Sequence, residues 1–406
     1  MPPVDPHKLQ IRSEIARQLR SHVEFLAGPE LKGRKPGTPG NQAAAHYIVT
    51  QFQEAGLAPL HSLRGYRQPI SAELGDNVVG ARIPNGSERD LKNHGWILIG
   101  AHYDHLGESV FGKTYRGADD NAAAVAILLH LARVLPPLAN HPVLFVAFNT
   151  EEPPFIRTRQ MGSQVFLDRL PSEIGASANI SAAIIMDLMG GIHWEPLREI
   201  IFAAGAEKST GLYRRFKESS DVNSLSTFSS GLSTPLSVLP LGTHLLEELP
   251  VIGHHPVSDY DAFRNASVPF VFLSAGRTPH YHQPSDLPDT LHYERMAATV
   301  RWLDHFVRLI DTDRDIYSFE PERLEIPDEW ETLRTLVDQA SRLESGIPNM
   351  SFFSLYRLQL DSRWLSQLIP ETVMLSEKRD KLLRRLERIS IRVQCLLADF
   401  YGCGFF

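Results

Sequence analysis

The chain has 406 residues, of which 43% are hydrophobic and 22% are charged, a composition typical of a folded globular protein rather than a disordered or fibrous one. Lys and Arg number 41 against 48 Asp and Glu, for a formal charge of -7, and no basic run of the kind that binds nucleic acid occurs. Its two cysteines, Cys395 and Cys403, lie near the C-terminus, which excludes a disulfide framework or a thiolate zinc knuckle.

The N-terminal segment, Met1 to Gln10, lacks the unbroken apolar stretch of a secretory signal. No segment reaches the run of about 18 apolar residues that a membrane span requires. We therefore expect a cytoplasmic protein without a membrane partner.

Apolar residues at helical spacing predict a helix from Leu9 to Leu26, and a Gly/Pro-rich loop, residues 33–40, separates it from a second helix over Asn41 to Glu54. Four nearly continuous apolar runs follow, as is typical of strands buried on both faces: Trp96 to Ile99, Val143 to Phe148, Ala182 to Met186 and Val268 to Leu273. The helical stretch Ala122 to Leu135 indicates a crossover between the first two strands. We expect an α/β fold with a mixed, mostly parallel central sheet covered by helices on both faces.

Two later segments lack the continuous apolar runs of the predicted strands. Ser209 to His255 is rich in Ser, Leu, Pro and Gly, and we interpret it as loops and short helices that form a cleft wall rather than core sheet. After Ile310 the sequence becomes charged and helical, so we divide the chain into residues 1–310 and a helical extension, 311–406. The last helix carries an apolar stripe at alternating spacings of four and three, namely Leu382, Leu386, Ile389, Val393, Leu396 and Phe400. The stripe packs either on its own domain or against a second copy in a homodimer.

A possible metal ligand lies at or after the C-terminal end of each predicted strand. His102 follows the first strand, the pair Glu151 and Glu152 follows the second, Asp187 follows the third, and His282 lies in the loop after the fourth. In open α/β sheets the carboxyl ends of the strands border the ligand crevice, so we expect these side chains to converge on a metal site.

Neighbouring carboxylates suggest divided roles. Asp104 lies two residues after His102, on the same side of an extended backbone, where it can orient the imidazole. Asp119 precedes an apolar helix and has two readings, a helix N-cap or a ligand that bridges two metals. Adjacent side chains point apart, so one of Glu151 and Glu152 can bind metal while the other takes a proton from water.

These motifs together resemble the M28 family of zinc peptidases over roughly residues 10 to 310. The motifs are Ala101-His-Tyr-Asp104, Gly117-Ala-Asp-Asp-Asn121, Asn149-Thr-Glu-Glu152 with Met161-Gly-Ser163, Met186-Asp-Leu188, and Tyr281-His-Gln-Pro-Ser-Asp286. The resemblance implies two zinc ions bridged by Asp119, with His102 and Asp187 on one and Glu152 and His282 on the other. It further implies Glu151 as general base, a cis peptide between Asp119 and Asp120, and Tyr281 as a group that polarises the substrate carbonyl.

The resemblance implies a metallopeptidase whose catalytic domain spans residues 1–310, acting on peptides and most similar to single-domain aminopeptidases. Two alternatives stay open: a glutaminyl cyclase-like acyl transfer with one zinc, and a catalytically inactive binding module of the same fold. Residues Pro153 to Gln160 are inserted where many members pass directly into a helix, which leaves the substrate preference undefined.

Overall fold

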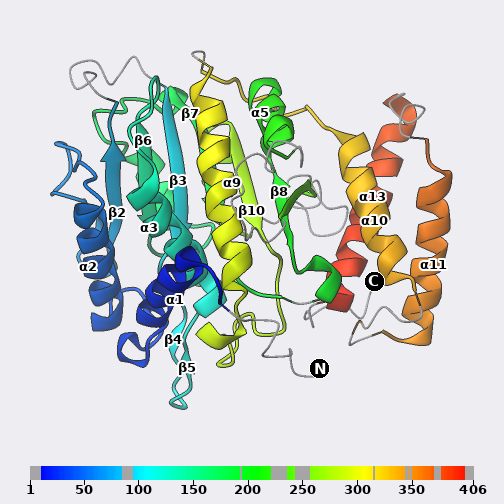
Figure 1. Ribbon diagram of the computed structural model, residues 1–406, viewed down its shortest axis with the longest axis horizontal. Coiled ribbons are helices and arrows are strands. Elements are labelled where there is room, and N and C mark those ends of the chain that lie inside the picture. Colours follow the sequence, from blue (N-terminus) through cyan, green and yellow to red (C-terminus); the bar gives the residue numbers. More distant parts are fainter. Residues whose placement is uncertain are drawn as a thin grey trace.

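The computed structural model describes residues 11–84, 95–192, 194–220, 236–242, 257–313, 316–342, 347, 350–369 and 376–397. Within these residues, an eight-stranded sheet runs through the larger part of the molecule in the order β1-β2-β6-β3-β7-β10-β8-β9 (Figure 1). The strands are β1 (Arg67–Ser71), β2 (Gly75–Arg82), β3 (Trp96–His102), β6 (Val143–Phe148), β7 (Ile180–Met186), β8 (Ile200–Ala204), β9 (Ser237–Pro240) and β10 (Phe270–Ser274).

The four predicted strands are the parallel centre of this sheet. β6, β3, β7 and β10 are consecutive neighbours and pair in parallel, whereas β1, β2 and β8 run antiparallel to their inner neighbours. Every residue of β3, β6 and β7 is buried, because apolar cores cover both faces. The predicted mixed, mostly parallel sheet is therefore confirmed.

Helices cover both faces of the sheet, as predicted. Ile97 and Ile99 of β3 point into one apolar cluster, with α1 (Glu14–Leu26), α2 (Pro39–Glu54), α3 (Ala124–Val134), α5 (Thr210–Ser220) and α9 (Tyr293–Asp311). Leu98 points into a second cluster with α4 (Gly162–Asp168) and α8 (Tyr260–Asn265), since successive strand residues face opposite sides. Short 3-10 turns span Pro29–Leu31, Ser177–Asn179, Glu195–Leu197, Ala206–Lys208 and Pro288–Thr290, and a π-type turn spans Ala118–Ala123.

The sequence did not predict the outer strands. We interpreted residues 209–255 as free of core sheet, which is wrong at β9, because Ser237–Pro240 pairs in parallel with β8. β1 alternates between buried and exposed positions and contains Pro69, and β9 is four residues long and ends at a proline. Such edge strands lack the continuous apolar run by which buried strands are recognised.

Residues after 310 form α10 (Ile326–Ala340), α11 (Phe352–Gln367) and α13 (Ser376–Leu397), at the right of Figure 1. These helices share a third apolar cluster, which includes five members of the predicted stripe: Leu382, Leu386, Ile389, Val393 and Leu396. The stripe therefore packs against its own chain over these positions, while Phe400 lies outside the described residues. In the described part of the chain, no helix is long and apolar enough to cross a membrane.

Candidate metal centre

The predicted ligands meet at the carboxyl edge of the parallel strands. His102 is the last residue of β3, Asp187 follows β7 directly, and Glu151 and Glu152 lie just beyond β6. His282 reaches the same place from the loop after β10, with its backbone at a φ of 54°. The first four side chains are buried, and His282 is 27% exposed at its side chain.

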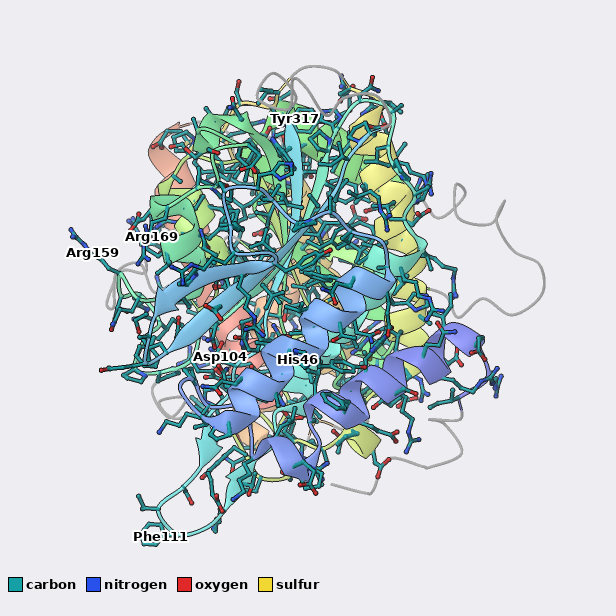
Figure 2. All side chains as sticks on the ribbon, turned by 90° about the vertical axis from the view of Figure 1, so that its left-hand side faces the viewer. His46, Asp104, Phe111, Arg159, Arg169 and Tyr317 are labelled. Atoms are coloured by element: carbon teal, nitrogen blue, oxygen red, sulfur yellow. The ribbon has the colours of Figure 1, made fainter. Side chains whose placement is uncertain are left out.

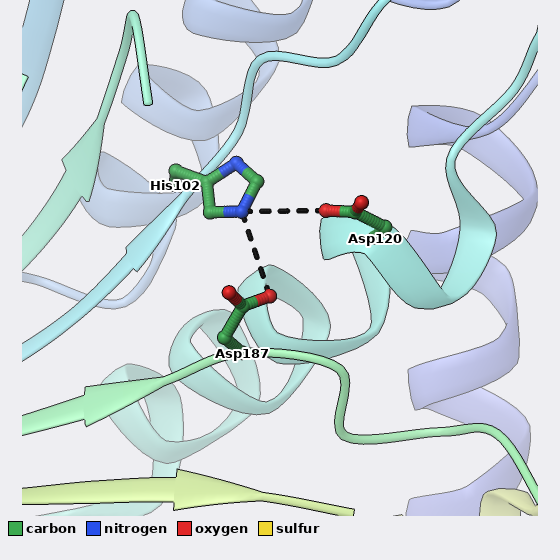
Figure 3. A group of neighbouring side chains, drawn as sticks. All are labelled: His102, Asp120 and Asp187. Carbon is green, nitrogen blue, oxygen red and sulfur yellow. Dashed lines mark ion pairs between the residues drawn. The ribbon is translucent and has the colours of Figure 1, made fainter. Parts of the chain in front are cut away.

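A first group forms around His102. Its Nε2 lies 3.4 Å from Oδ1 of Asp120 and 3.5 Å from Oδ1 of Asp187, as Figure 3 shows. The three side chains come from the end of β3, the π-type turn before α3 and the end of β7. One imidazole and two carboxylates, all buried, therefore face one another across gaps too wide for strong hydrogen bonds.

A second group forms around His282. Its Nε2 lies 3.2 Å from Oδ2 of Asp120 and 3.1 Å from Oε2 of Glu152. His105 also faces this group, with Nδ1 at 2.6 Å from Oε1 of Glu152. Asp120 thus gives one oxygen to each group, which is the arrangement expected of a carboxylate that bridges two ions.

Asp119, the residue predicted to bridge, has a different position. Its Oδ1 accepts hydrogen bonds from the amides of Gly190 and Gly191, at 2.7 and 2.9 Å, in the loop after β7. The cis peptide lies between Asp120 and Asn121, so the prediction of a cis bond at Asp119-Asp120 is wrong by one residue. The prediction of Asp119 as the bridge is corrected in the same way, because the turn directs Asp119 towards the β7 loop and Asp120 towards the histidines.

The turn that carries Asp120 is held by Asp286. Its two carboxylate oxygens accept hydrogen bonds from the amides of Asp119 and Asp120, at 2.8 and 3.2 Å. Asp286 belongs to the same loop as His282 and is buried. One loop therefore supplies both a ligand of the second group and the support for the shared carboxylate.

Asp104 supports the glutamate pair. Its Oδ1 and Oδ2 accept the amides of Glu151 and Glu152 at 3.1 and 3.2 Å, while its Oδ1 lies 3.7 Å from Nδ1 of His102. The Asp104 carboxylate is thus farther from the imidazole than a hydrogen bond, whereas the backbone carbonyl of Asp104 lies 3.3 Å from Nδ1 of His102. The Asp104 carboxylate holds the backbone of the loop after β6, which carries Glu151 and Glu152.

The two glutamates differ in environment, as predicted. Burial raises the pKa of Glu151 well above its ordinary value, against the effect of His102, whose Nε2 is 3.7 Å away. Burial acts in the same sense on Glu152, but the neighbouring His105 and His282 outweigh it and lower the pKa of Glu152. Glu151 is therefore suited to hold a proton and Glu152 to remain an anion.

Both predicted histidine ligands favour a positive partner. Burial disfavours their charged forms, yet the surrounding carboxylates raise the pKa of His282 to about 10 and that of His102 well above 6.5. The groups around them carry an excess of negative charge. A proton or a metal ion on these nitrogens relieves that excess.

Tyr281 forms part of the rim beside His282. The two rings stack with centroids 3.8 Å apart, and the guanidinium of Arg277 lies 4.6 Å from the centroid of the Tyr281 ring. Burial and the nearby carboxylates of Asp120, Glu152 and Glu151 raise the pKa of Tyr281 well above 10. Its hydroxyl is therefore protonated and able to donate a hydrogen bond at neutral pH.

The inserted residues Pro153 to Gln160 leave directly from Glu152. The Phe155 amide donates to the Glu152 carbonyl at 2.9 Å, and Arg157 and Arg159 line a cavity of about 540 Å³ together with residues of α4 and α8. Figure 2 shows Arg159 pointing outward at the edge of the molecule. The insertion thus adds cationic side chains to the surface next to the centre.

Sequence reasoning named Asp119 rather than Asp120 as the bridging carboxylate, and it gave no role to several other residues that complete this centre: His105, Asp286, Asp259, Arg34 and Arg295. Asp259 is fully buried, and burial raises its pKa to about 7. Within the described residues, the Arg34 guanidinium donates to four backbone carbonyls, those of Leu26, Tyr103, Arg116 and Gly117. Asp120 and Asp286 stand within the quoted motifs, so their presence was visible, but the direction of each side chain depends on turn geometry that spacing does not define.

The spacing of the donor atoms fits zinc. Zinc bonds of about 2.0–2.1 Å to nitrogen and oxygen place neighbouring ligand atoms about 3.3 Å apart. The four separations from His102 and His282 to their carboxylate partners range from 3.1 to 3.5 Å. In the described residues, Nε2 of His102, His105 and His282 and Oδ1 of Asp187 are buried and lack the hydrogen-bond partner that buried polar atoms ordinarily have.

Residues 77–307 match the family described as peptidase family M28, a span that contains all the side chains of both groups. The chain belongs to peptidase family M28. Its fold is that of the zinc aminopeptidases: the structure of BSAP, a zinc aminopeptidase from Bacillus subtilis, superposes with a TM-score of 0.52 at 14% identity, over 77% of this chain and 97% of that one.

Sequence relatives span different lengths of the chain. The uncharacterised protein YfbL of Escherichia coli is 29% identical over 71% of this chain and 86% of its own length. Aminopeptidase YwaD of Bacillus subtilis is 26% identical over 42% of this chain and 33% of its own length. The fold is shared with cyclases as well, since the glutaminyl cyclase of Fimbriiglobus ruber superposes with a TM-score of 0.50 at 18% identity, over 75% of this chain and 99% of that one.

Proposed function

We propose that this chain is an aminopeptidase that removes N-terminal residues from peptides at a centre of two zinc ions. The proposal rests on Asp120, whose two carboxylate oxygens face different histidines. Oδ1 lies 3.4 Å from Nε2 of His102, and Oδ2 lies 3.2 Å from Nε2 of His282. His102 and Asp187 would complete one zinc site, and Glu152 and His282 the other.

The charge at the centre supports two ions rather than one. Eight carboxylates are buried at or beside it, against two buried guanidinium groups: Asp104, Asp119, Asp120, Glu151, Glu152, Asp187, Asp259 and Asp286, with Arg34 and Arg295. Buried charges without partners are strongly unfavourable. Two divalent ions would offset more of this negative charge than a single ion would.

Each side chain has a distinct part in the proposed reaction. Two bound zinc ions would act as Lewis acids and lower the pKa of an attacking water. Glu151, whose raised pKa suits proton transfer, takes the proton from that water and returns one to the leaving amine. Tyr281, protonated at neutral pH, donates a hydrogen bond to the carbonyl oxygen as negative charge develops on it.

Relatives named aminopeptidases support aminopeptidase over carboxypeptidase activity. A free α-amino group is a cation, which any carboxylate left uncompensated by the metal ions would attract.

The two alternatives make different demands on these residues. A one-zinc cyclase has no need of a complete second ligand group, whereas both groups here have one imidazole and two carboxylate oxygens. A binding module that had lost its metals would not retain an aligned, buried ligand set. The completeness of both groups therefore favours the hydrolase.

The change Glu151→Gln tests the proposal. The amide keeps the size of the side chain but cannot accept the proton, so we expect two zinc ions per chain and a loss of aminoacyl-anilide hydrolysis of about 10²–10⁴-fold. The matched control is Glu30→Gln, an exposed position outside both ligand groups, which should behave as the parent.

Three substrate classes assayed side by side separate the candidate functions: aminoacyl anilides, N-blocked peptides and peptides with N-terminal glutamine. Hydrolysis of the anilides alone supports the aminopeptidase. Undiminished anilide hydrolysis by the Glu151→Gln variant contradicts the base assignment, and cyclisation of N-terminal glutamine without hydrolysis contradicts the proposed function.

A further inference from the structure

His105 is a fully buried histidine in the loop after β3, and the proposed reaction gives it no role. Its Nδ1 lies 2.6 Å from Oε1 of Glu152. This separation is that of a hydrogen bond involving a charged partner, and it is shorter than the spacing of about 3.3 Å between two ligands of one tetrahedral zinc. His105 and Glu152 are therefore bonded to each other rather than to a common ion.

The two oxygens of Glu152 are divided between two histidines. Oε1 faces Nδ1 of His105 at 2.6 Å, and Oε2 faces Nε2 of His282 at 3.1 Å. Only the second distance matches the spacing of two zinc ligands. Of these two histidines, His282 is thus the one placed as a metal ligand. His105 instead forms a hydrogen bond with the other carboxylate oxygen of Glu152, Oε1.

His105 also contacts the other members of the second group. Its ring meets the ring of His282 edge to face, with centroids 5.8 Å apart and planes at 63°. Its Nδ1 lies 3.8 Å from Oδ2 of Asp120, the oxygen that faces His282. The His105 imidazole therefore lies next to all three side chains that would hold the second ion, namely Glu152, His282 and Asp120.

The backbone leaves space for this ring at Gly117. A Cβ at Gly117 would lie 2.5 Å from Cγ of His105 and 2.1 Å from the carbonyl oxygen of Asp120, and the residue has a φ of 59°. Glycine adopts this conformation at little cost, whereas other residues are strained in it. The turn that carries Asp120 is thus built around the His105 ring.

We propose that His105 is a positioning residue for the second zinc site, an inference that rests on the proposed two-zinc function. By donating from Nδ1 to Oε1, it orients the Glu152 carboxylate so that Oε2 alone is presented to the metal. Hydrogen-bonded carboxylate ligands are held in direction by such partners, whose loss costs about 10–100-fold in metal affinity. The two sites should therefore depend unequally on His105.

A pair of variants of the full-length chain isolates the hydrogen bond. In His105→Asn, the side-chain amide can donate from nearly the position of Nδ1, whereas His105→Leu keeps apolar bulk without a donor. The readout is zinc affinity, measured for the metal-free protein by competition with a chromophoric chelator that resolves two binding steps, with thermal unfolding recorded alongside.

We expect His105→Leu to weaken one zinc step by about 10–100-fold and to leave the other unchanged, while His105→Asn stays within about threefold of the parent at both steps. If His105→Leu does not fold, His105→Gln replaces it, because its amide lies near the former Nε2 and points away from Glu152. Unchanged affinity at both steps in the donor-free variant would overturn the inference. Equal weakening of both steps, with the same loss in His105→Asn, would assign His105 a packing role and overturn it too.

The failure of the underlying two-zinc proposal would look different. A parent protein that binds a single ion contradicts the proposed function whatever the variants do. A parent that binds two ions, with neither step sensitive to His105, contradicts the positioning role alone.

Discussion

At the scale of single residues, the centre depends on which of two adjacent aspartates faces the histidines. Asp120 belongs to both groups of potential ligands, and Asp119 instead binds two amides of the loop after β7. The sequence predicted a bridging carboxylate before α3 and assigned that role to Asp119. The choice between the two adjacent aspartates follows from the π-type turn, whose geometry is not encoded in residue spacing.

Exchanging each aspartate for asparagine should separate their roles. Asp120→Asn removes half of the anionic oxygen pair shared by the two groups, so we expect zinc affinity to fall at both sites by at least about 100-fold. Asp119→Asn retains an Oδ1 that accepts from Gly190 and Gly191, so it should keep both ions. Zinc content after dialysis, measured by mass spectrometry, checks both; loss of metal in Asp119→Asn with retention in Asp120→Asn would reverse the assignment.

Proton release provides a second measurement at this scale. The pKa of His282 is about 10 without metal, so its imidazole is protonated at pH 7 and an incoming ion must displace the proton. Because the proton competes below this pKa, zinc affinity should rise with pH between 6 and 8, by about tenfold per pH unit for each proton displaced. Calorimetric titration in buffers of different ionisation enthalpy counts the protons. An affinity independent of pH would contradict the charge state assigned to the centre.

At the scale of elements, parallel pairing makes the centre possible. The strands β6, β3, β7 and β10 all end at one edge, so the loops that follow them deliver their side chains to one place. This part could be predicted, because fully buried strands have continuous apolar sequences. The contacts between loops could not be, since residues such as Asp104 and Asp286 bind backbone amides whose positions emerge only after folding.

Asp286 illustrates how one loop stabilises another. Asp286→Ala leaves the amides of Asp119 and Asp120 without their acceptors in a buried turn. Unsatisfied buried donors that faced a charged group are costly, so we expect the free energy of unfolding of the metal-free protein to fall by about 2–4 kcal/mol. Urea denaturation provides the value. Asp289→Ala, at an exposed position of the same loop region, is the control, and an equal effect of both changes would contradict the specific role of Asp286.

At the scale of the whole molecule, the sheet that carries the site and the C-terminal helices pack around different apolar clusters. The sheet contributes to the first two clusters on its two faces, while α10, α11 and α13 pack around the third with Trp194 and Leu197. A division of the chain near residue 310 remains our prediction, as does homodimer formation. The apolar stripe of α13 is covered by its own chain over Leu382 to Leu396, so a dimer would have to use another surface.

The inner strands and the types of metal ligand could be predicted from the sequence. The strands are continuous apolar runs, and His, Asp and Glu residues follow where these runs end. The outer strands β1, β8 and β9 were missed because they are short or only partly buried, and β2 because glycine and polar residues interrupt its apolar run. The same limit applies to the roles of His105 and Arg34, which depend on contacts across the molecule: Arg34 binds the carbonyl of Gly117, 83 positions away.

The measurement that tests the central claim most directly is the zinc content of the purified parent chain, with metal and protein quantified on the same sample after removal of loosely bound ions. The division of Asp120 between two complete ligand groups predicts two zinc ions per chain. One ion, or none after saturation with zinc, would contradict it.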